Sequence, residues 1–354
     1  MDLDALRKEI DALDDEVLRL LSERARHVVE IGRLKQETGA TVFDPARERR
    51  IMERLLAATS GPLSAEAVRE VFASIFSVSR LLEKQLVVAY YGPAGSFTHI
   101  AARRKFGAGA DFRPCDTIAD VSVAVEKGDA DFGVMPIENT TAGVVPLTLD
   151  ALVESKLKIA AEVYVDIEHY LLSGCPDLAG VARVYSHPQA LAQCRVWLKS
   201  NLPRADLIPV GSTARGAELA AREPGAAAIG PALAGELYDV PVLAEKVHDH
   251  AGNRTRFFVC GRTESMPSGR DKTSLVFSVA HKSGALYQAL GVFGQHDISM
   301  TFIQSHPTKQ TPWEYMFFVD LEGHSQEEGV AQALRELRDH THTLRVLGSY
   351  PEAV

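Results

Sequence analysis

The residues of the first 85 positions that are best suited to chemistry are cations in an apolar setting. Between residues 3 and 36, apolar side chains recur at heptad spacing, and the next two positions of that series are Arg24 and His27. Because burying an unpaired charge is costly, an inward Arg24 calls for an anionic partner. The alternative is a side chain that reaches solvent and covers neighbouring methyl groups. Lys35 lies about three helical turns further along the same stripe, so the two cations could grip a small anion together.

Other charged and polar residues of this segment could complete such a site. Arg7 precedes Arg24 by roughly 25 Å along the helix and is rotated from it by about 100°. It therefore cannot serve the same pocket within one straight helix, but in an antiparallel dimer it could reach the pocket of the partner chain. The second predicted helix opens with the charged pair Arg47 and Glu48. On the third, Ser79 and Glu83 are four residues apart and therefore share one face. For the first pair, a solvated helix start is the alternative.

A second group of polar residues follows or opens apolar strands between residues 86 and 262. The stretches GVMPIENTTAGVV, VYSHPQALAQC and NRTRFFV hold them, and YYGPAGSFTHIAA supplies a Gly-rich turn whose backbone amides suit an anion. Ligand-binding loops gather at strand ends in α/β folds. The candidates are Glu138, Asn139, Ser186, Gln193, Thr255, Arg256 and Phe257. Taken singly, these stretches are also compatible with ordinary turns and a structural His187.

Three helices must position the first group. The sequence predicts one helix over residues 3–36 ending near Gly39, a second from Asp44 to Gly61 and a third from Ser64 to about Lys84. A helix on the order of 50 Å long cannot be covered by two shorter neighbours. We therefore expect its apolar surface to be buried against a second chain.

The pattern changes at Leu86. Short apolar runs then alternate with helical stretches up to about residue 262, which predicts parallel strands in an α/β domain of two lobes around a cleft. A polar linker over 262–272 precedes a β-α-β-β-α-β pattern that fits a ferredoxin-like domain. The predicted fold is multidomain: all-α (residues 1–85), two-lobed α/β (86–262) and α+β (273–350).

Composition excludes several classes of function. The 354 residues are 46% apolar and 24% charged, and a net charge of −9 disfavours binding to nucleic acid or to an anionic membrane. The start lacks the pattern of a signal peptide and no apolar run could span a bilayer, so a cytoplasmic location is expected. The four cysteines lack the spacing of a zinc site or a disulfide framework.

The helical segment resembles a known family. ALRKEIDALDDEVLRLLSERARHVVEIGRLK, FDPARERRIMERL and SVSRLLEKQ are similar to the three-helix chorismate mutase domain at the start of bacterial P-proteins. Chorismate mutases rearrange chorismate to prephenate in a pericyclic reaction. This reaction needs the substrate to be held in one conformer and cations near its ether oxygen, but no nucleophile, base or metal. The resemblance implies that Lys35 meets this oxygen, that a protonated Glu83 donates to it, and that Arg7 comes from the partner chain. The implied substrate-binding residues are Arg7, Arg24, Lys35, Arg47, Glu48, Ser79 and Glu83.

The α/β segment closely resembles prephenate dehydratase over residues 87–262, in the stretches quoted above and in STARGAELA. The resemblance implies two lobes like those of periplasmic binding proteins. It makes Thr255 the acid that helps the ring hydroxyl of prephenate to leave. Arg256 is among the residues implied to form or support the pocket, and its guanidinium could hold a substrate carboxylate. The other implied pocket residues are Glu138, Asn139, Ser186, Gln193 and Phe257. No metal, nicotinamide or phosphate cofactor is implied.

The C-terminal segment resembles an ACT domain, a regulatory module that binds amino acids. Its expected effector-binding residues are Gly284, Ala285, Leu286, Gln304, Ser305 and His306. QSHP stands at 304–307 where dehydratases with phenylalanine feedback usually have ESRP, so retention, loss or change of the effector all stay open. A domain that only dimerises is a further alternative.

The sequence therefore predicts a bifunctional enzyme of phenylalanine biosynthesis. Its expected partners are the small molecules chorismate and prephenate, an amino-acid effector and further copies of the chain in a homodimer or larger oligomer. Two alternatives remain: a two-lobed solute-binding or sensor protein without catalysis, and a dehydratase whose helical domain merely dimerises.

Overall fold

The computed structural model of this chain describes residues 2–307 and 315–353. It divides into two compact units: one comprises Met1–Leu86 and Phe106–Asp111, and the other comprises Val87–Lys105 and Phe112–Val354.

The first unit is helical, and its helices begin where the sequence predicts, although the second helix ends at Ala58, before the predicted stop at Gly61. It contains α1 (Leu3–Thr38), α2 (Pro45–Ala58) and α3 (Ala65–Glu83). Asp44 and Ser64 accept hydrogen bonds from backbone amides in the first turns of α2 and α3. Gly39 ends α1 in the left-handed conformation, with φ of 68°.

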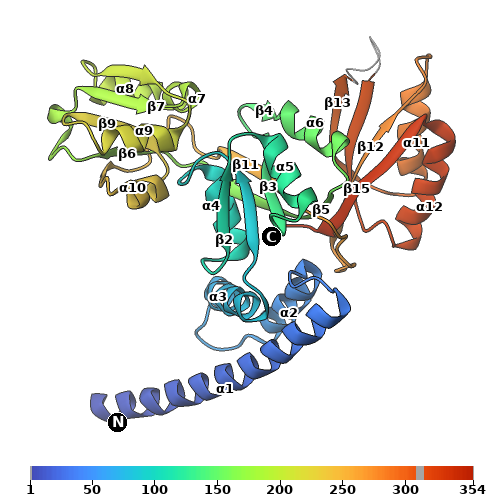
Figure 1. The fold of residues 1–354 in the computed structure, drawn as a ribbon, viewed down its shortest axis with the longest axis horizontal. Helices are drawn as coiled ribbons and strands as arrows, with labels where there is room; N and C mark the ends of the chain where they lie inside the picture. The colour runs from blue at the N-terminus through green and yellow to red at the C-terminus, as the bar shows by residue number, and fades with distance from the viewer. Residues whose placement is uncertain (1, 308–314, 354) are drawn as a thin grey trace. The chain divides into compact units, whose positions relative to one another are not determined.

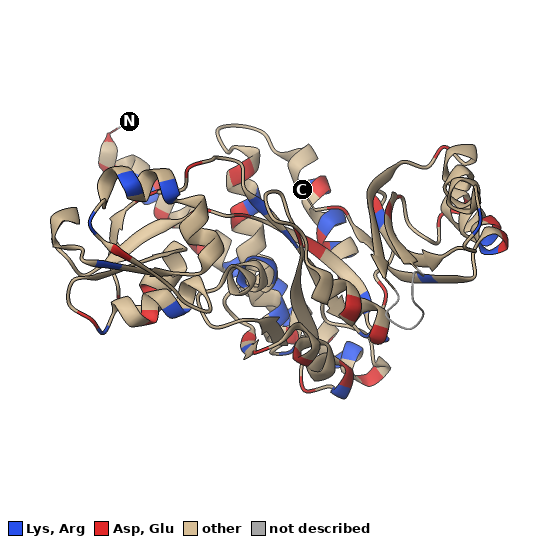
Figure 2. Ribbon diagram, turned by 90° about the horizontal axis from the view of Figure 1, so that it is seen from above, with Lys and Arg blue, Asp and Glu red and all other residues tan. Residues whose placement is uncertain are grey.

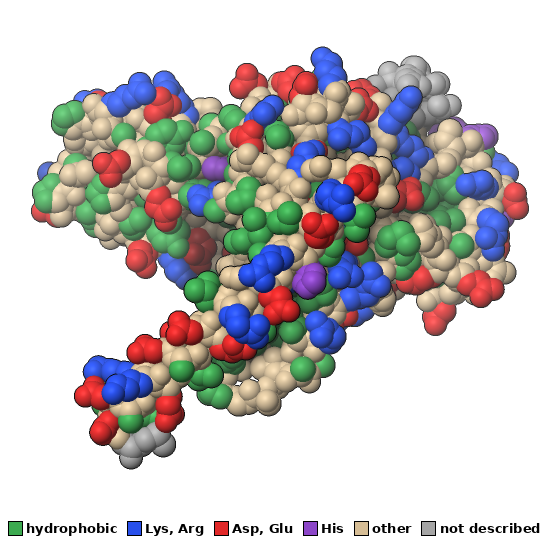
Figure 3. Space-filling model, turned by 60° about the horizontal axis from the view of Figure 1, so that its bottom comes forward, with side chains coloured by type: hydrophobic (Ala, Val, Ile, Leu, Met, Phe, Trp, Pro, Cys, Tyr) green, Lys and Arg blue, Asp and Glu red, His purple; other side chains and the backbone are tan. Residues whose placement is uncertain are grey.

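Much of the apolar surface of α1 has no cover within its own unit. Figure 1 shows the N-terminal part of α1 running free of α2 and α3, and only Val28 and Gly32 are buried on this helix. Exposed apolar side chains lie among charged ones along it (Figure 3). They are Leu3, Leu6, Ile10, Leu13, Val17, Leu18, Leu20, Leu21, Val29, Ile31 and Leu34.

The second unit begins with a lobe built on a mixed sheet of strand order β2-β1-β3-β11-β5, with β4 paired to β3. The strands are β1 (Val87–Tyr91), β2 (Asp111–Cys115), β3 (Phe132–Asn139), β4 (Gly143–Val144), β5 (Lys158–Asp166) and β11 (Arg254–Gly261). The helices are α4 (Phe97–Phe106), α5 (Ile118–Lys127) and α6 (Pro146–Glu154). Residues of α5, α6 and β3 share the main core of this lobe.

The second lobe has strand order β10-β6-β9-β7-β8. Its strands are β6 (Tyr170–Ser173), β7 (Arg183–Ser186), β8 (Asp206–Pro209), β9 (Ala226–Gly230) and β10 (Val242–Ala244). Its helices are α7 (Pro188–Gln193), α8 (Arg195–Asn201), α9 (Thr213–Ala220) and α10 (Ala232–Tyr238).

The chain passes between the lobes twice, after β5 and after β10, which confirms the predicted pair of lobes. The prediction of parallel strands is correct for β1 with β3 and for β7 with β8 and β9. It is wrong for β11 and for β6, which runs antiparallel to β9 and β10. β11 runs antiparallel to both β3 and β5, because it re-enters the first sheet from the other lobe.

The C-terminal domain has the predicted β-α-β-β-α-β order. It comprises β12 (Asp271–Ser278), α11 (Ala285–Gln295), β13 (Met300–Pro307), β14 (Tyr315–Glu322), α12 (Glu328–Leu337) and β15 (Thr343–Pro351). Its strand order is β13-β14-β12-β15. Phe277 and Val319 pack with side chains of α11 and α12 on one face of this sheet, whereas Val276 and Phe318 on the other face join the core of the first lobe.

Figure 2 shows basic and acidic residues interspersed over the elements of the chain. None of the described helices combines the length and apolar character needed to cross a lipid bilayer.

Candidate functional sites

The helical unit brings four predicted residues together between α1 and α3. Arg24 donates a hydrogen bond to the hydroxyl of Ser79, and Lys35 Nζ lies 2.7 Å from Glu83 Oε2 and 3.1 Å from the carbonyl oxygen of Val42. Arg24 and Lys35 are both partly buried. No carboxylate in the described part of the chain pairs with Arg24. Its guanidinium is therefore a half-buried cation with unused donors, as an anion-binding site requires.

Glu48 extends this group through a residue that the sequence analysis missed. Glu48 pairs with Arg80, whose buried guanidinium also donates to the carbonyl oxygen of Phe106 at 3.2 Å. In the sequence, only its spacing could have indicated that Arg80 is buried. It follows the buried Phe76 by four residues and therefore lies on the same stripe of α3.

Two predicted residues lie outside this group. Arg7 is exposed and contacts only Asp4, at 3.4 Å, among the described residues. Arg47 is also exposed. The placement of Arg7 agrees with the helical rotation that separates it from Arg24.

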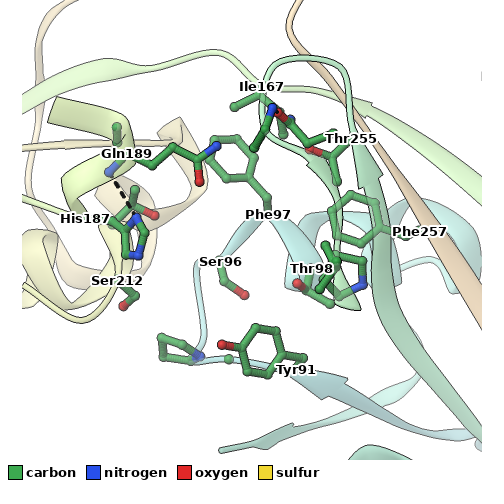
Figure 4. Close-up of a pocket in the computed structure, with 18 of the residues that line it drawn as sticks. Tyr91, Ser96, Phe97, Thr98, Ile167, His187, Gln189, Ser212, Thr255 and Phe257 are labelled. Atoms are coloured by element: carbon green, nitrogen blue, oxygen red, sulfur yellow. Dashed lines mark hydrogen bonds between the residues drawn. The ribbon is translucent and has the colours of Figure 1, made fainter. Parts of the chain in front are cut away.

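A second candidate site lies between the two lobes, in a cavity of about 750 Å³. Thr255 and Phe257 of β11 reach it from the first lobe together with Asn139, and Gln193 reaches it from the second lobe. Figure 4 shows Thr255 and Phe257 across the cavity from His187, Gln189 and Ser212, with Phe97 between them. The lining thus combines aromatic rings with a few polar groups, as small-molecule sites commonly do.

The predicted role of Arg256 has to be corrected. Side chains alternate along a strand, so Thr255 and Phe257 face the cavity while Arg256 faces the opposite side of the sheet. Its guanidinium is only 5% exposed and lies 2.7 Å from Glu162 and 2.6 Å from Asp320. It therefore cannot hold a carboxylate in this cavity. The two-residue period of strands was the signal that could have excluded it.

Glu138 and Ser186 also do not line the cavity. Glu138 is the β3 neighbour of Arg256, on the face of the sheet opposite to Asn139. Ser186 is fully buried, and its hydroxyl donates to the carbonyl oxygen of Ile229 at 2.6 Å. It holds the end of β7 against β9, one residue before the cavity-lining His187.

The cavity contains a cation that the sequence analysis did not single out. Arg215 is the only lysine or arginine among the described lining residues, and it also binds Glu218 at 2.5 Å. It lies in the first turn of α9, whose N-cap Ser212 also lines the cavity. An arginine three residues after a helix-capping serine was the available signal, because anions bind at helix N-termini.

The Gly-rich turn after β1 brings the first lobe against the second. Gly95 has φ of 82°, and a Cβ atom there would lie 3.1 Å from the Cα of Ala234 in α10. Only glycine allows both this conformation and this approach. The following residues Ser96 and Phe97 line the cavity, together with Tyr91.

The candidate effector residues occupy one end of the C-terminal sheet but do not form one cluster. Gly284 caps α11 with φ of 81°, and Leu286 packs into the core beneath the helices. His306 instead faces the first lobe, where its Nε2 lies 2.7 Å from Asp150 of α6.

Among the described residues, no group of three or more His, Cys, Asp or Glu is placed to hold a metal ion. The cysteines Cys115, Cys175, Cys194 and Cys260 are all free.

Comparisons with known proteins match the whole chain. Family models for chorismate mutase type II, prephenate dehydratase and the ACT domain match residues 6–84, 88–265 and 273–339. The bifunctional chorismate mutase/prephenate dehydratase of Aquifex aeolicus is 46% identical and covers 100% of this chain and 99% of its own.

Solved structures resemble about three quarters of this chain. Prephenate dehydratase from Arthrobacter aurescens in complex with L-Phe is 33% identical, with a TM-score of 0.71 over 76% of this chain and 90% of its own. A protein described as a novel type of quorum quenching acylase is 32% identical, with a TM-score of 0.70 over 75% of this chain and 98% of its own.

Proposed function

Because this chain belongs to the family of bifunctional chorismate mutase/prephenate dehydratases, we propose that it catalyses two consecutive steps of phenylalanine biosynthesis. The helical unit would rearrange chorismate to prephenate, and the two-lobed domain would convert prephenate to phenylpyruvate. The observation that carries this proposal is that one chain holds two sites of different chemistry. The first is a cation-lined site between helices, and the second is a cleft with a buried hydroxyl on its wall.

In the mutase site, the protein would act by holding charge in place. Chorismate carries two carboxylates, and the unused donors of Arg24 suit one of them. Lys35 would stabilise the negative charge that develops on the ether oxygen as the C–O bond breaks. In the structure Lys35 is paired with Glu83, so substrate must share or displace this contact. Glu48, Ser79 and the exposed Arg47 would also belong to the residues that bind the substrate.

We propose that the mutase site is completed by a second chain. The exposed apolar side chains of α1 form a surface that a partner helix would remove from water, in a homodimer or larger oligomer. Arg7 lies on the part of α1 that has no cover from α2 or α3, where it could enter the partner's site. A helical domain that merely dimerises would not need a half-buried Arg24 that pairs with no described carboxylate.

In the dehydratase site, Thr255 would assist the departure of the ring hydroxyl. Prephenate loses CO2, and the electron pair of the broken C–C bond forms the aromatic ring while hydroxide leaves as water after accepting a proton. Thr255 is 8% exposed and lies on the cavity wall, where its hydroxyl can donate to the leaving oxygen. Arg215 takes the place of Arg256 as the cation for a substrate carboxylate, and Phe97 and Phe257 would contact the ring.

For the C-terminal domain we propose allosteric regulation by an aromatic amino acid. The L-Phe complex of the Arthrobacter aurescens dehydratase supports an amino-acid effector. His306 and Gln304 replace two charged residues of the usual motif, so calorimetry and inhibition assays should compare phenylalanine with tyrosine. Absence of heat and of inhibition with both would refute regulation by either. The cytoplasmic location and the independence from cofactors stay predictions.

The decisive experiment is to supply chorismate to the purified protein without any added cofactor and to follow prephenate and phenylpyruvate separately. We expect both to form in sequence. Binding without turnover would favour a solute-binding or sensor protein. Turnover of prephenate but not of chorismate would favour a dehydratase whose helical domain only dimerises.

A further inference from the structure

A chain of hydrogen bonds crosses from the second lobe to the hydroxyl of Thr255. It begins at His169, in the first of the two connections between the lobes, and continues through Gln193 of α7. From there it reaches Thr141 and then Asn139 in the first lobe. Asn139 Nδ2 lies 2.8 Å from Thr255 Oγ1. Thr141 does not line the cavity, so it has no direct access to a substrate there.

The direction of the last link is fixed by the backbone. Asn139 Oδ1 accepts from the amide nitrogens of Thr141 at 3.0 Å and Ala142 at 2.9 Å. Backbone amides can only donate, so the oxygen of Asn139 must face them and its nitrogen must face Thr255. Thr255 Oγ1 is consequently an acceptor in this contact. Its own proton has no other acceptor among the described residues and is free to be donated into the cavity.

Burial determines the direction of the first hydrogen bond of the chain, between His169 and Gln193. His169 is 2% exposed, and its Nδ1 has no hydrogen-bond partner among the described residues. Leaving a bare acceptor without a partner costs less than leaving an N–H group without one, because the latter is a strong donor. We therefore assign the proton to Nε2, which donates to Gln193 Oε1 at 2.9 Å. Burial also lowers the pKa of His169, in keeping with a neutral ring.

The middle links follow from these two ends. With its oxygen bound to His169, Gln193 donates from Nε2 to Thr141 Oγ1 at 3.0 Å. The hydroxyl of Thr141 then donates to Asn139 Oδ1 at 2.7 Å. Every bond of the chain thus donates in the same direction, toward Thr255, and hydrogen bonds in such a series polarise one another.

We propose that His169 and Thr141 are positioning residues of the dehydratase reaction, which hold the two lobes in register and support the Asn139 amide that leaves the Thr255 proton facing the cavity. The inference rests on the proposed dehydratase function. It adds a reason for the site to lie between lobes: through Gln193 and Thr141, a residue in the connection between the lobes supports the Asn139 amide that binds Thr255.

The test replaces Thr141, because this residue is exposed and its replacement should not impair folding. In the full-length protein, Thr141→Val removes the hydroxyl but keeps the shape, and Thr141→Ser keeps the hydroxyl. We expect Thr141→Val to lower kcat for prephenate by about tenfold with KM changed less than about twofold, because misorientation affects the transition state more than ground-state binding. Thr141→Ser should restore kcat, and mutase activity should stay the same in both variants.

A second pair tests the beginning of the chain. His169→Gln keeps an N–H donor for Gln193, whereas His169→Met fills similar space without one. The inference requires kcat to be retained better in His169→Gln than in His169→Met. It is overturned if Thr141→Val matches the wild type, if Thr141→Ser is as impaired as Thr141→Val, or if the losses appear only in KM. Failure of the dehydratase function itself would be distinct, since the wild-type protein would then not turn over prephenate.

Discussion

Arg256 and Asp320 form an ion pair of 2.6 Å in the protein interior, and this pair joins the strand that carries Thr255 to the C-terminal domain. Arg256 also binds Glu162 at 2.7 Å, and Lys272 of β12 binds the other oxygen of Glu162 at 3.0 Å. Burial alone would raise the pKa of Glu162, but these two cations hold it below its ordinary value. The C-terminal domain and the two-lobed domain therefore share a buried charge network directly behind the cavity.

The first prediction concerns this network. Arg256→Met leaves buried carboxylates short of their cation, so we expect a loss of about 3–5 kcal/mol in the free energy of unfolding. Arg256→Lys keeps one positive charge and should lose less. Chemical denaturation of the full-length protein measures both. If Arg256 instead bound substrate, Arg256→Lys would raise KM for prephenate while stability stayed near that of the wild type.

The second prediction concerns the cation that lines the cavity. Arg215→Gln should raise KM for prephenate by about tenfold, with a smaller change in kcat, because a charge-assisted contact to a carboxylate is lost. Arg222→Gln is the matched control, since Arg222 binds the same Glu218 at 2.8 Å but does not line the cavity. Steady-state kinetics provides the measurement. If the two changes raised KM equally, Arg215 would be a surface residue of α9 that does not bind the substrate.

The third prediction separates the two activities. Thr255→Ala should lower dehydratase kcat by about 10² or more, in the range of general acid catalysis, and should leave mutase activity intact. Thr255→Ser keeps a donor hydroxyl and should retain part of the activity. Separate assays with chorismate and prephenate provide the measurement. A parallel loss of both activities in Thr255→Ala would argue against two independent sites.

Local signals predicted much of this fold. The capping residues Asp44 and Ser64 and the terminal Gly39 placed the helix ends correctly, because caps act on the nearest turn of backbone. The antiparallel entry of β11 was not predictable in the same way. It depends on the pairing of Thr255 with Asn139, which lies more than a hundred residues earlier in the chain.

The candidate sites show the same difference between local signals, which the sequence reveals, and long-range contacts, which it does not. Arg24, Lys35, Ser79 and Glu83 come together because helical spacing already placed them on facing stripes. The partner of Arg256 in the C-terminal domain, Asp320, is set by contacts between domains that no short stretch of sequence describes.

The fourth prediction concerns the uncovered surface of α1. Leu13→Asp places a charge among exposed apolar side chains, so it should weaken association and shift the mass measured by light scattering toward the monomer. Mutase activity should fall with it, because Arg7 of the partner chain would no longer reach the site. Asp14→Lys changes a neighbouring charge without removing apolar surface and is the control. A monomeric wild-type protein with full mutase activity would contradict this prediction.

The fifth prediction concerns acid stability near the cavity. His99 stacks on Tyr90 with ring centroids 4.7 Å apart, and its Nδ1 accepts a hydrogen bond from the amide of Gly95 at 3.1 Å. Burial, with a smaller contribution from Arg103, lowers the pKa of His99 to about 4 from an ordinary value of 6.5. Between these values the folded protein binds fewer protons than the unfolded chain. Stability should therefore be complete above pH 6.5 and decline as the pH falls toward 4.

The replacement that isolates this effect is His99→Asn, whose side-chain oxygen can still accept from Gly95 but does not titrate. Loss of the stacked ring will lower stability at every pH, so the informative quantity is the slope of unfolding free energy against pH. We expect a shallower slope in the variant between pH 6.5 and 4. Some slope should remain, because the buried His169 also has a lowered pKa. Identical slopes in the two proteins would mean that protonation of His99 does not limit acid stability.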